Sequence, residues 1–213
     1  MKTALLAGAT GLVGSELLPR LLAPSRYTKV IAVGRHPVSL THPKLVQVKT
    51  ELSQLDAVRL RLIADDVYCC LGTTMRQAGS KEAFYEVDFL HVVKLAAIAT
   101  ANFASQFLVV SAMGADAHSR FYYNQVKGEM EQAVRRAPFR ALHIFRPSLL
   151  LGERAVPRLG EQLGAFFLKL AGPLLRGNWR KYRAVAAATV AQAMLRAAES
   201  DVRGIHVHES DTL

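Results

Sequence analysis

Cysteine is scarce in this chain of 213 residues: there are two, Cys69 and Cys70, and they are adjacent. Neighbouring cysteines cannot join distant segments, so a disulfide framework is excluded, and so is a metal site built from several cysteines. Such usage is typical of proteins kept in a reducing compartment. We therefore expect a cytoplasmic location.

Long hydrophobic runs are missing as well. No apolar stretch reaches the ~18 residues that a membrane-spanning helix needs. The short apolar run at residues 4–7 follows Lys2, as in a signal peptide, but glycines at positions 8, 11 and 14 interrupt it, and a helical pattern follows directly. The sequence thus predicts neither a secretory signal nor a membrane partner.

Acidic residues are few relative to basic ones: 17 Asp and Glu stand against 27 Lys and Arg, which gives a formal net charge of +10. The excess is not confined to one tail, although seven basic residues fall between positions 150 and 183. An anionic ligand, a nucleic acid or a merely solvated surface would each explain it. Because no nucleic-acid-binding module and no interleaving of basic and aromatic residues accompany the charge, we expect no nucleic-acid partner.

The chain does have enough apolar sequence for a single domain over residues 1–213, since 51% of its residues are hydrophobic. Short apolar runs predict strands, and apolar residues at helical spacing predict helices. The expected strands cover residues 3–7, 29–34, 45–48, 67–71, 106–111, 140–145 and 204–208. The expected helices cover residues 12–22, 52–63, 80–101, 121–136, and stretches near 160–175 and 184–199.

Strands and helices alternate along the chain. This order predicts an α/β fold: a doubly wound, mostly parallel sheet with helices on both faces. Most of the strands are apolar throughout, as expected when both faces of a sheet are covered. We expect residues 148–183 to form a small C-terminal extension on the substrate side, inserted within the same domain.

A glycine-rich segment, Gly8-Ala9-Thr10-Gly11-Leu12-Val13-Gly14, joins the first expected strand to the first expected helix. In a dinucleotide-binding loop the first glycine permits a tight turn, the second lets the backbone approach a pyrophosphate, and the third lets helix and strand pack closely. The helix N-terminus then offers N–H groups and a partial positive charge. A purely structural turn would share the spacing. We expect cofactor contacts from Gly8, Thr10, Gly11, Leu12, Val13 and Gly14.

An arginine follows the second expected strand, which ends Val33-Gly34-Arg35-His36. NAD-binding versions of this arrangement place an acidic residue there to hold the ribose 2′-hydroxyl, whereas a planar guanidinium suits a 2′-phosphate. Arg35 therefore predicts NADP(H) rather than NAD(H) as the cofactor. A surface arginine without such a role is the alternative.

Tyr123 and Lys127 are four residues apart in an expected helix and so share one face. A free tyrosine has a pKa of about 10, too high for efficient proton transfer near neutrality. A lysine ammonium ~4 Å away would stabilise the phenolate by up to ~4 kcal/mol at an effective dielectric near 20. The pair is a candidate for general acid–base catalysis, with ordinary helix-surface residues as the alternative.

Ser111 ends the expected strand 106–111, at the edge that faces the ligand crevice in an open α/β sheet. A hydroxyl there can orient and polarise a substrate carbonyl while Tyr123 exchanges the proton. A hydrolase is the weaker interpretation, because Ser111 lacks the GxSxG elbow of a nucleophilic serine. His206 and His208 alternate on the last expected strand, but a metal site would need further ligands, and we expect no metal.

Four further segments carry a resemblance to a known family. They are Cys70-Leu71-Gly72-Thr73-Thr74, Ser111-Ala112-Met113-Gly114-Ala115-Asp116, Tyr123-Asn124-Gln125-Val126-Lys127-Gly128-Glu129 and Phe145-Arg146-Pro147. With the glycine loop, they resemble the short-chain dehydrogenase/reductases of the extended or atypical kind. More narrowly, they are similar to the Tat-interacting oxidoreductase-like group, a branch of NADP-binding Rossmann proteins. The resemblance is most secure over residues 3–150.

The resemblance implies a role for each matching position. The glycine loop would hold the pyrophosphate, and Arg35 would meet the 2′-phosphate. Lys127 would bind the nicotinamide ribose as well as act on Tyr123, and Tyr123 would also contact the cofactor. Further cofactor contacts would come from Glu51 near the adenine, from Leu71, Gly72 and Thr73 along the ribose side, and from Pro147 beside the nicotinamide.

Asp88 departs from the family pattern, in which an asparagine after the fourth strand supports a proton-relay water. An altered relay puts turnover in question. The short region after Pro147 also argues against a nucleotide-sugar substrate. Its apolar residues suggest a small or hydrophobic ligand, or else an ordinary helical core. These residues are Phe166, Phe167, Leu170, Leu174 and Trp179.

Two functions fit these observations. The first is an NADP(H)-dependent oxidoreductase of the short-chain dehydrogenase/reductase type, with Ser111, Tyr123 and Lys127 as catalytic residues. Its small-molecule substrate would be a small or hydrophobic carbonyl or alcohol. The second is an NADP(H)-binding redox sensor or protein-interaction scaffold with little catalysis, which Asp88 motivates. By analogy alone, a homodimer would pair through the helices that follow the fourth and fifth strands.

Overall fold

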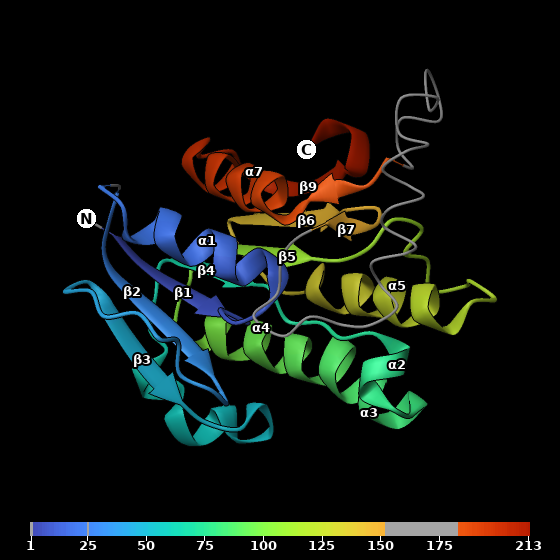
Figure 1. The fold of residues 1–213 in the computed structure, drawn as a ribbon, viewed down its shortest axis with the longest axis horizontal. Coiled ribbons are helices and arrows are strands. Elements are labelled where there is room, and N and C mark those ends of the chain that lie inside the picture. The colour runs from blue at the N-terminus through green and yellow to red at the C-terminus, as the bar shows by residue number, and fades with distance from the viewer. Residues whose placement is uncertain (1, 25, 152–182) are drawn as a thin grey trace.

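The computed structural model describes residues 2–24, 26–151 and 183–213. Seven strands form one parallel sheet in the order β3-β2-β1-β4-β5-β6-β9 (Figure 1). Their bounds are β1 (Lys2–Ala7), β2 (Tyr27–Gly34), β3 (Leu45–Lys49), β4 (Asp66–Cys69), β5 (Gln106–Val110), β6 (Ala141–Arg146) and β9 (Gly204–Glu209). The first six follow the doubly wound Rossmann order, so the predicted fold class is confirmed.

Helices cover both faces of this sheet (Figure 1). The helices α1 (Leu12–Leu22) and α7 (Ala187–Glu199) pack on one face, where their buried side chains join those of β1, β2 and β6. The other face is covered by η1 (Leu52–Arg61), α4 (His91–Ala101) and α5 (Tyr122–Val134). Covered on both sides, the central strands β1, β4, β5 and β6 are buried along most of their length, whereas the edge strands β3 and β9 keep exposed residues.

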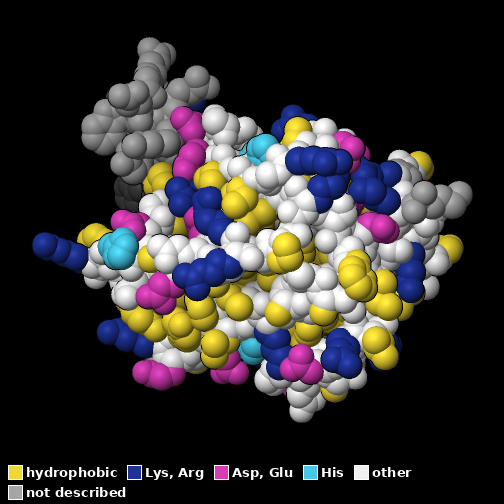
Figure 2. Space-filling model, turned by 180° about the vertical axis from the view of Figure 1, so that it is seen from behind, with side chains coloured by type: hydrophobic (Ala, Val, Ile, Leu, Met, Phe, Trp, Pro, Cys, Tyr) yellow, Lys and Arg dark blue, Asp and Glu magenta, His cyan; other side chains and the backbone are white. Residues whose placement is uncertain are grey.

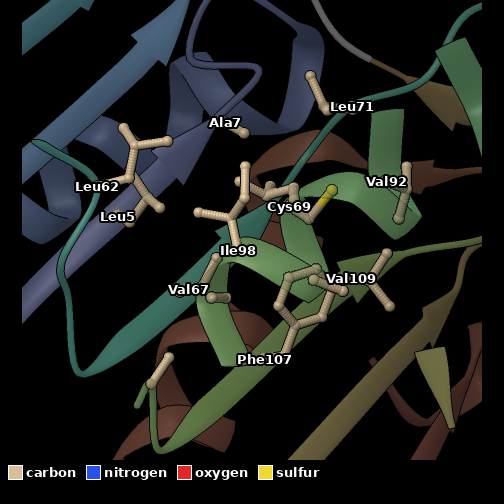
Figure 3. Close-up of a cluster of buried hydrophobic side chains, with 14 of the residues drawn as sticks. Leu5, Ala7, Leu62, Val67, Cys69, Leu71, Val92, Ile98, Phe107 and Val109 are labelled. Carbon is tan, nitrogen blue, oxygen red and sulfur yellow. The ribbon is translucent and has the colours of Figure 1, made fainter. Parts of the chain in front are cut away.

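The core beneath α4 shows why apolar and polar residues do not alternate along the central strands (Figure 3). Val67 and Cys69 of β4 and Phe107 and Val109 of β5 point toward Ile98 of the helix, and all five are buried. Their intervening neighbours point to the opposite face, into the layer beneath α1 and α7. Both faces of each strand therefore contribute apolar burial, at roughly 25 cal/mol for each Å² removed from water.

The expected helix over residues 80–101 is interrupted. It consists of α3 (Lys81–Tyr85), a π-helical stretch η2 (Glu86–Leu90) and α4, and a short helix α2 (Met75–Ala78) precedes it. A π turn changes the direction in which the following side chains point and is frequent at functional sites. Asp88 lies inside this stretch and is fully buried. Sequence periodicity could not reveal the interruption, because the apolar pattern continues through it.

Two further expectations differ from the structure. Residues 52–61 form a 3₁₀ helix with a kink at Gln54 in place of an α-helix. The fourth strand ends at Cys69 instead of residue 71, because the chain leaves the sheet there to border a cleft. The strand was predicted too long because residues 70 and 71 are apolar, but in the structure both lie in the loop after β4.

The expected insertion at 148–183 lies mostly outside the described residues, as do the helix near 160–175 and the apolar residues proposed to contact a ligand. Its flanks form a small parallel pair, β7 (Leu150–Leu151) with β8 (Val185–Ala186). The helix expected at 184–199 is confirmed as α7, which starts directly after β8. Among the described residues, the helices are too short or too polar to cross a membrane.

Lys and Arg side chains are dispersed over the face of the molecule in Figure 2. They lie between acidic and apolar side chains rather than in a single basic patch. A nucleic acid bound through its phosphates needs a continuous basic surface. The described residues of this face provide no such surface.

A stack of histidines joins β6 to β9 at the end of the sheet. His143 is 1% exposed, and its Nδ1 lies 3.1 Å from Nε2 of His208. Its ring stacks on those of His206 and His208, with centroids 5.1 and 5.4 Å away. Burial, followed by the two neighbouring rings, lowers the pKa of His143 to about 4, and burial also lowers the pKa of His208. Among the described residues, no group of three or more His, Cys, Asp or Glu could hold a metal.

The low pKa values predict that acid destabilises the protein. In the unfolded chain a histidine titrates near 6.5, so it binds protons before the folded protein does. The free energy of unfolding should stay constant above about pH 6.5 and fall toward pH 4, by up to ~1.4 kcal/mol per pH unit for each such histidine. Urea unfolding across this range tests it. His143→Gln should flatten the profile, the exposed His118→Gln should not, and a flat wild-type profile would contradict the prediction.

Candidate functional site

A cleft lies at the carboxyl edge of the sheet, where the strand order reverses around β1. It is bordered by the glycine loop at residues 8–11, by residues 32–38 at and beyond the end of β2, and by residues 70–72 after β4. In open α/β sheets, ligands bind in this position. Three segments that are distant in sequence thus meet at one edge.

The glycine loop has the geometry that its sequence predicts. Gly8 has φ +84°, and a Cβ there would lie 2.5 Å from the carbonyl oxygen of Cys70. A Cβ on Gly14 would lie 2.0 Å from the Gly8 carbonyl oxygen, so α1 and the loop approach each other too closely for any side chain. Gly11 precedes α1 with no side-chain cap, which leaves the first-turn amides of the helix for an anion.

The far end of the cleft is basic. Arg35 and His36 border it, as does Lys49, which is paired with Gly34 in the register of β2 and β3. Glu51 lies nearby and is exposed, but it is not among the residues bordering the cleft, whereas the adjacent Leu52 is. The geometry therefore brings Arg35 and the glycine loop to one cavity.

The remaining predicted cofactor residues divide into two groups. Gly8, Thr10, Gly11, Leu71 and Gly72 border the cleft with Arg35. Leu12, Val13, Gly14, Thr73 and Pro147 do not: Val13 and Gly14 are buried, and the carbonyl of Pro147 accepts the backbone N–H of Met113 at 2.9 Å.

Asp88 and Lys127 form a buried ion pair directly behind the cleft. Lys127 Nζ lies 2.7 Å from Asp88 Oδ1, and Asp88 Oδ2 accepts the backbone N–H of Thr73 at 2.8 Å. Gly72, which borders the cleft, lies next to the pair: a Cβ there would lie 3.3 Å from Asp88 Oδ1 and 3.6 Å from Lys127 Nζ. Asp88, which stands where the family pattern has an asparagine, is therefore next to the predicted catalytic lysine.

Lys127 remains charged in this environment. Burial acts to lower its pKa, but the neighbouring Asp88 and Tyr123 outweigh that effect and raise the pKa above its ordinary value. An ammonium buried this deeply would be costly if it were unpaired. Asp88 therefore stabilises the charge on Lys127 and also cancels much of its field.

Tyr123 lies one helical turn before Lys127 on α5 and is half-buried. Its ring packs against that of Phe84, with centroids 5.4 Å apart. Tyr123 and Lys127 thus lie one turn apart on the same helix, and Asp88 is the residue whose side chain contacts Lys127 directly.

The hydroxyl of Ser111 is bound to a second buried carboxylate. Ser111 Oγ donates to Glu131 Oε1 at 2.6 Å. Arg146 donates to the same carboxylate through Nε at 2.9 Å and through Nη2 at 2.7 Å, and its Nη1 reaches Glu209 at 3.0 Å. The hydrogen bond to Glu131, ahead of other contributions, raises the pKa of Arg146 above its ordinary value. In this arrangement Ser111 can only accept a hydrogen bond, so its predicted role as donor requires the bond to Glu131 to open.

Glu131 and Arg146 are site residues that the sequence prediction missed. A weak signal was available, because Glu131 follows Lys127 by four residues and so lies on the same helix face. Its contact with Ser111 depends on how α5 docks on the sheet. Gly128 lets α5 lie close to the loop after β5, since a Cβ there would lie 2.1 Å from the backbone nitrogen of Ala117.

Residues 8–156 match a family described as NAD(P)H-binding. Protein HTATIP2 from Rattus norvegicus is 36% identical over 198 residues, which cover 91% of this chain and 80% of the relative. Protein FMP52-1, mitochondrial, from Scheffersomyces stipitis is 34% identical over 155 residues, which cover 71% of this chain and 69% of the relative.

A solved structure shares the fold. The Bordetella bronchiseptica enzyme WbmH in complex with NAD+ superposes with a TM-score of 0.72 at 16% identity, covering 98% of this chain and 76% of that one. At so low an identity, the likeness concerns the Rossmann architecture.

The expectation of a cytoplasmic location is wrong. The relative from Scheffersomyces stipitis is named as a mitochondrial protein, and so are relatives from Emericella nidulans and Eremothecium gossypii. Those names point to mitochondria. Scarce cysteine indicates reducing conditions, which are not restricted to one compartment.

Proposed function

The chain belongs to the NAD(P)H-binding family, and from this premise we propose that it is an NADP(H)-dependent oxidoreductase of the short-chain dehydrogenase/reductase type. Its substrate would be a small or hydrophobic carbonyl compound or alcohol. The observation that carries the proposal is the cleft that joins the glycine loop to Arg35, with Lys127 of α5 next to its border at Gly72.

The residues of the cleft fit such a cofactor. The uncapped N-terminus of α1 and the close backbone approach at Gly8 suit a pyrophosphate, and Arg35 suits a 2′-phosphate. When bound, the cofactor supplies hydride transfer to or from the substrate carbon. Tyr123 would exchange a proton with the substrate oxygen, and Lys127 would hold the position of the phenol and of the ribose.

Arg35 provides the first test, through cofactor preference. NADPH should raise the thermal unfolding midpoint at lower concentration than NADH does. Arg35→Ala should remove about 1.5–3 kcal/mol of charge-assisted binding and so weaken NADPH by roughly 10- to 150-fold, with little effect on NADH.

Lys29 offers a matched control, since it is an exposed basic residue of β2, the strand that Arg35 follows, and does not border the cleft. Lys29→Ala should leave both cofactors unaffected. Equal stabilisation of the wild-type protein by NADH and NADPH would refute the assignment of Arg35.

A sensor or scaffold with little catalysis is the second candidate. Two contacts favour it: Ser111 donates a hydrogen bond to Glu131, and Lys127 forms an ion pair with Asp88. Both residues that were predicted to assist Tyr123 in catalysis therefore interact with carboxylates of the protein. A panel of aldehydes and ketones incubated with NADPH separates the two functions. An oxidoreductase consumes NADPH with at least one of them, whereas a sensor binds NADPH without consuming it.

A further inference from the structure

Asp88 and Lys127 bring a hydrogen-bond acceptor and a hydrogen-bond donor to one point on the border of the cleft. That point is Gly72, where a Cβ would lie 3.3 Å from Asp88 Oδ1 and 3.6 Å from Lys127 Nζ. Val87, the residue before Asp88 in η2, borders the cleft as well. Glycine at position 72 therefore keeps the space beside both charged atoms free of a side chain.

Both charged atoms retain hydrogen-bonding capacity. In the part of the chain that the structure describes, Lys127 Nζ pairs only with Asp88 Oδ1, at 2.7 Å, although an ammonium has three protons to donate. Asp88 Oδ2 accepts the backbone N–H of Thr73 at 2.8 Å, whereas Oδ1 is fully buried and has no described partner besides the ammonium. Buried polar atoms usually have their hydrogen bonds satisfied, so these two atoms are candidates to receive a polar group of a ligand.

The charge of the pair determines which polar group it suits. A phosphate or carboxylate would accept a hydrogen bond from Lys127 but would also face the carboxylate of Asp88, and like charges at one buried site oppose each other. A hydroxyl group is both an acceptor and a donor. It can accept from the ammonium through its oxygen and donate its proton to Asp88 Oδ1. The pair therefore suits a neutral hydroxyl rather than an anion.

We propose that Asp88 and Lys127 form a hydroxyl-binding subsite beside Gly72, in which Asp88 is the residue that selects a neutral sugar hydroxyl over an anionic group. The proposal rests on the proposed function, in which NADPH carries such hydroxyls on the ribose attached to its nicotinamide. It adds Asp88 as the acceptor for a hydroxyl and Gly72 as the residue that keeps the subsite open.

Two ligands that differ at this subsite test the proposal by isothermal titration calorimetry of the full-length protein. NADPH carries the nicotinamide ribose, whereas adenosine 2′,5′-bisphosphate keeps the adenine half with its 2′-phosphate but lacks that ribose. In Asp88→Asn, the Thr73 N–H retains the one remaining side-chain oxygen, so an NH₂ group replaces the acceptor Oδ1. We expect this variant to bind NADPH about 10- to 150-fold more weakly, the usual loss for a hydrogen bond to a charged group. Its affinity for adenosine 2′,5′-bisphosphate should equal that of the wild type.

Asp56 is the matched control for this substitution, because it forms an exposed ion pair with Lys94 at 2.6 Å and does not border the cleft. Asp56→Asn should leave the affinities for both ligands unchanged. Equal weakening of both ligands in Asp88→Asn would indicate a structural effect and overturn the proposal, and so would unchanged NADPH binding.

Gly72→Ala tests the opening while the ion pair stays in place. Gly72 does not share the positive φ of Gly8, and the new Cβ would meet only the ends of two side chains. We expect NADPH to bind weaker by about tenfold or more and adenosine 2′,5′-bisphosphate to bind as before, because the methyl group occupies the place of the ribose hydroxyl. Gly34→Ala is the control: Gly34 borders the Arg35 end of the cleft, where a Cβ would meet no atom within 4 Å. It should change both affinities by the same factor.

Gly72→Ala also decides the question if Asp88→Asn does not fold. In that case, a variant that binds NADPH as tightly as the wild type, or that weakens both ligands equally, overturns the proposed subsite. Failure of the wild type to bind either ligand is a different result, and it would refute the proposed function itself.

Discussion

Tyr123→Phe is expected to lower turnover by about 10²–10⁴-fold, the usual contribution of a general acid or base. The substitution removes the hydroxyl and keeps the ring, whose packing against Phe84 holds α5 on α3. The cleft residues that would hold NADPH lie on other elements, so the cofactor should bind almost as tightly as in the wild type. The measurement is NADPH consumption with whichever carbonyl compound the panel identifies, together with NADPH titration of the variant.

The neighbouring tyrosine is the control for this experiment. Tyr122 also lies in the first turn of α5 and near Phe84, but its hydroxyl donates to the backbone carbonyl of Lys81 at 3.1 Å. Tyr122→Phe should therefore leave turnover within a few-fold of the wild type. Unchanged turnover in Tyr123→Phe would remove Tyr123 from the reaction, and equal losses in both variants would indicate a packing effect.

Local patterns predicted the geometry of the glycine loop that borders the cleft. The turn after β1 depends on the conformational freedom of Gly8 and on the close contact of Gly14, which are properties of single residues in a known local setting. The spacing of Tyr123 and Lys127 likewise needs only the helix repeat. Such features are encoded within a few residues, so the sequence alone can show them.

The other contacts of the candidate site depend on how distant elements pack, and the sequence did not predict them. Asp88 reaches Lys127 only because a π turn reorients it, and Ser111 meets Glu131 only because α5 packs along β5 and β6. Both contacts join residues 20 or more positions apart in the chain. The sequence identified Asp88 as a departure, but the consequence of that departure depends on tertiary packing.

Gly8→Ala is expected to weaken folding and cofactor binding together. Gly8 has φ +84°, which an alanine adopts at a cost of about 1–2 kcal/mol. The new Cβ would also lie 2.5 Å from the backbone oxygen of Cys70, so the loop or the chain after β4 must move. We expect the free energy of unfolding to fall by about 3–5 kcal/mol in total, within the range of the severe substitutions. NADPH affinity should fall at least tenfold, because both displaced segments border the cleft.

Gly79→Ala separates the two contributions. Gly79 ends α2 with φ +81°, almost the same as Gly8, but a Cβ there would have no atom within 4 Å. Its substitution should cost only the backbone term of about 1–2 kcal/mol and leave NADPH binding intact. The difference between the two variants in urea unfolding is therefore the cost of the close approach between the glycine loop and Cys70. Equal losses would show that the loop can withdraw from Cys70 freely, and the cleft would then lack the rigid backbone on which pyrophosphate binding depends.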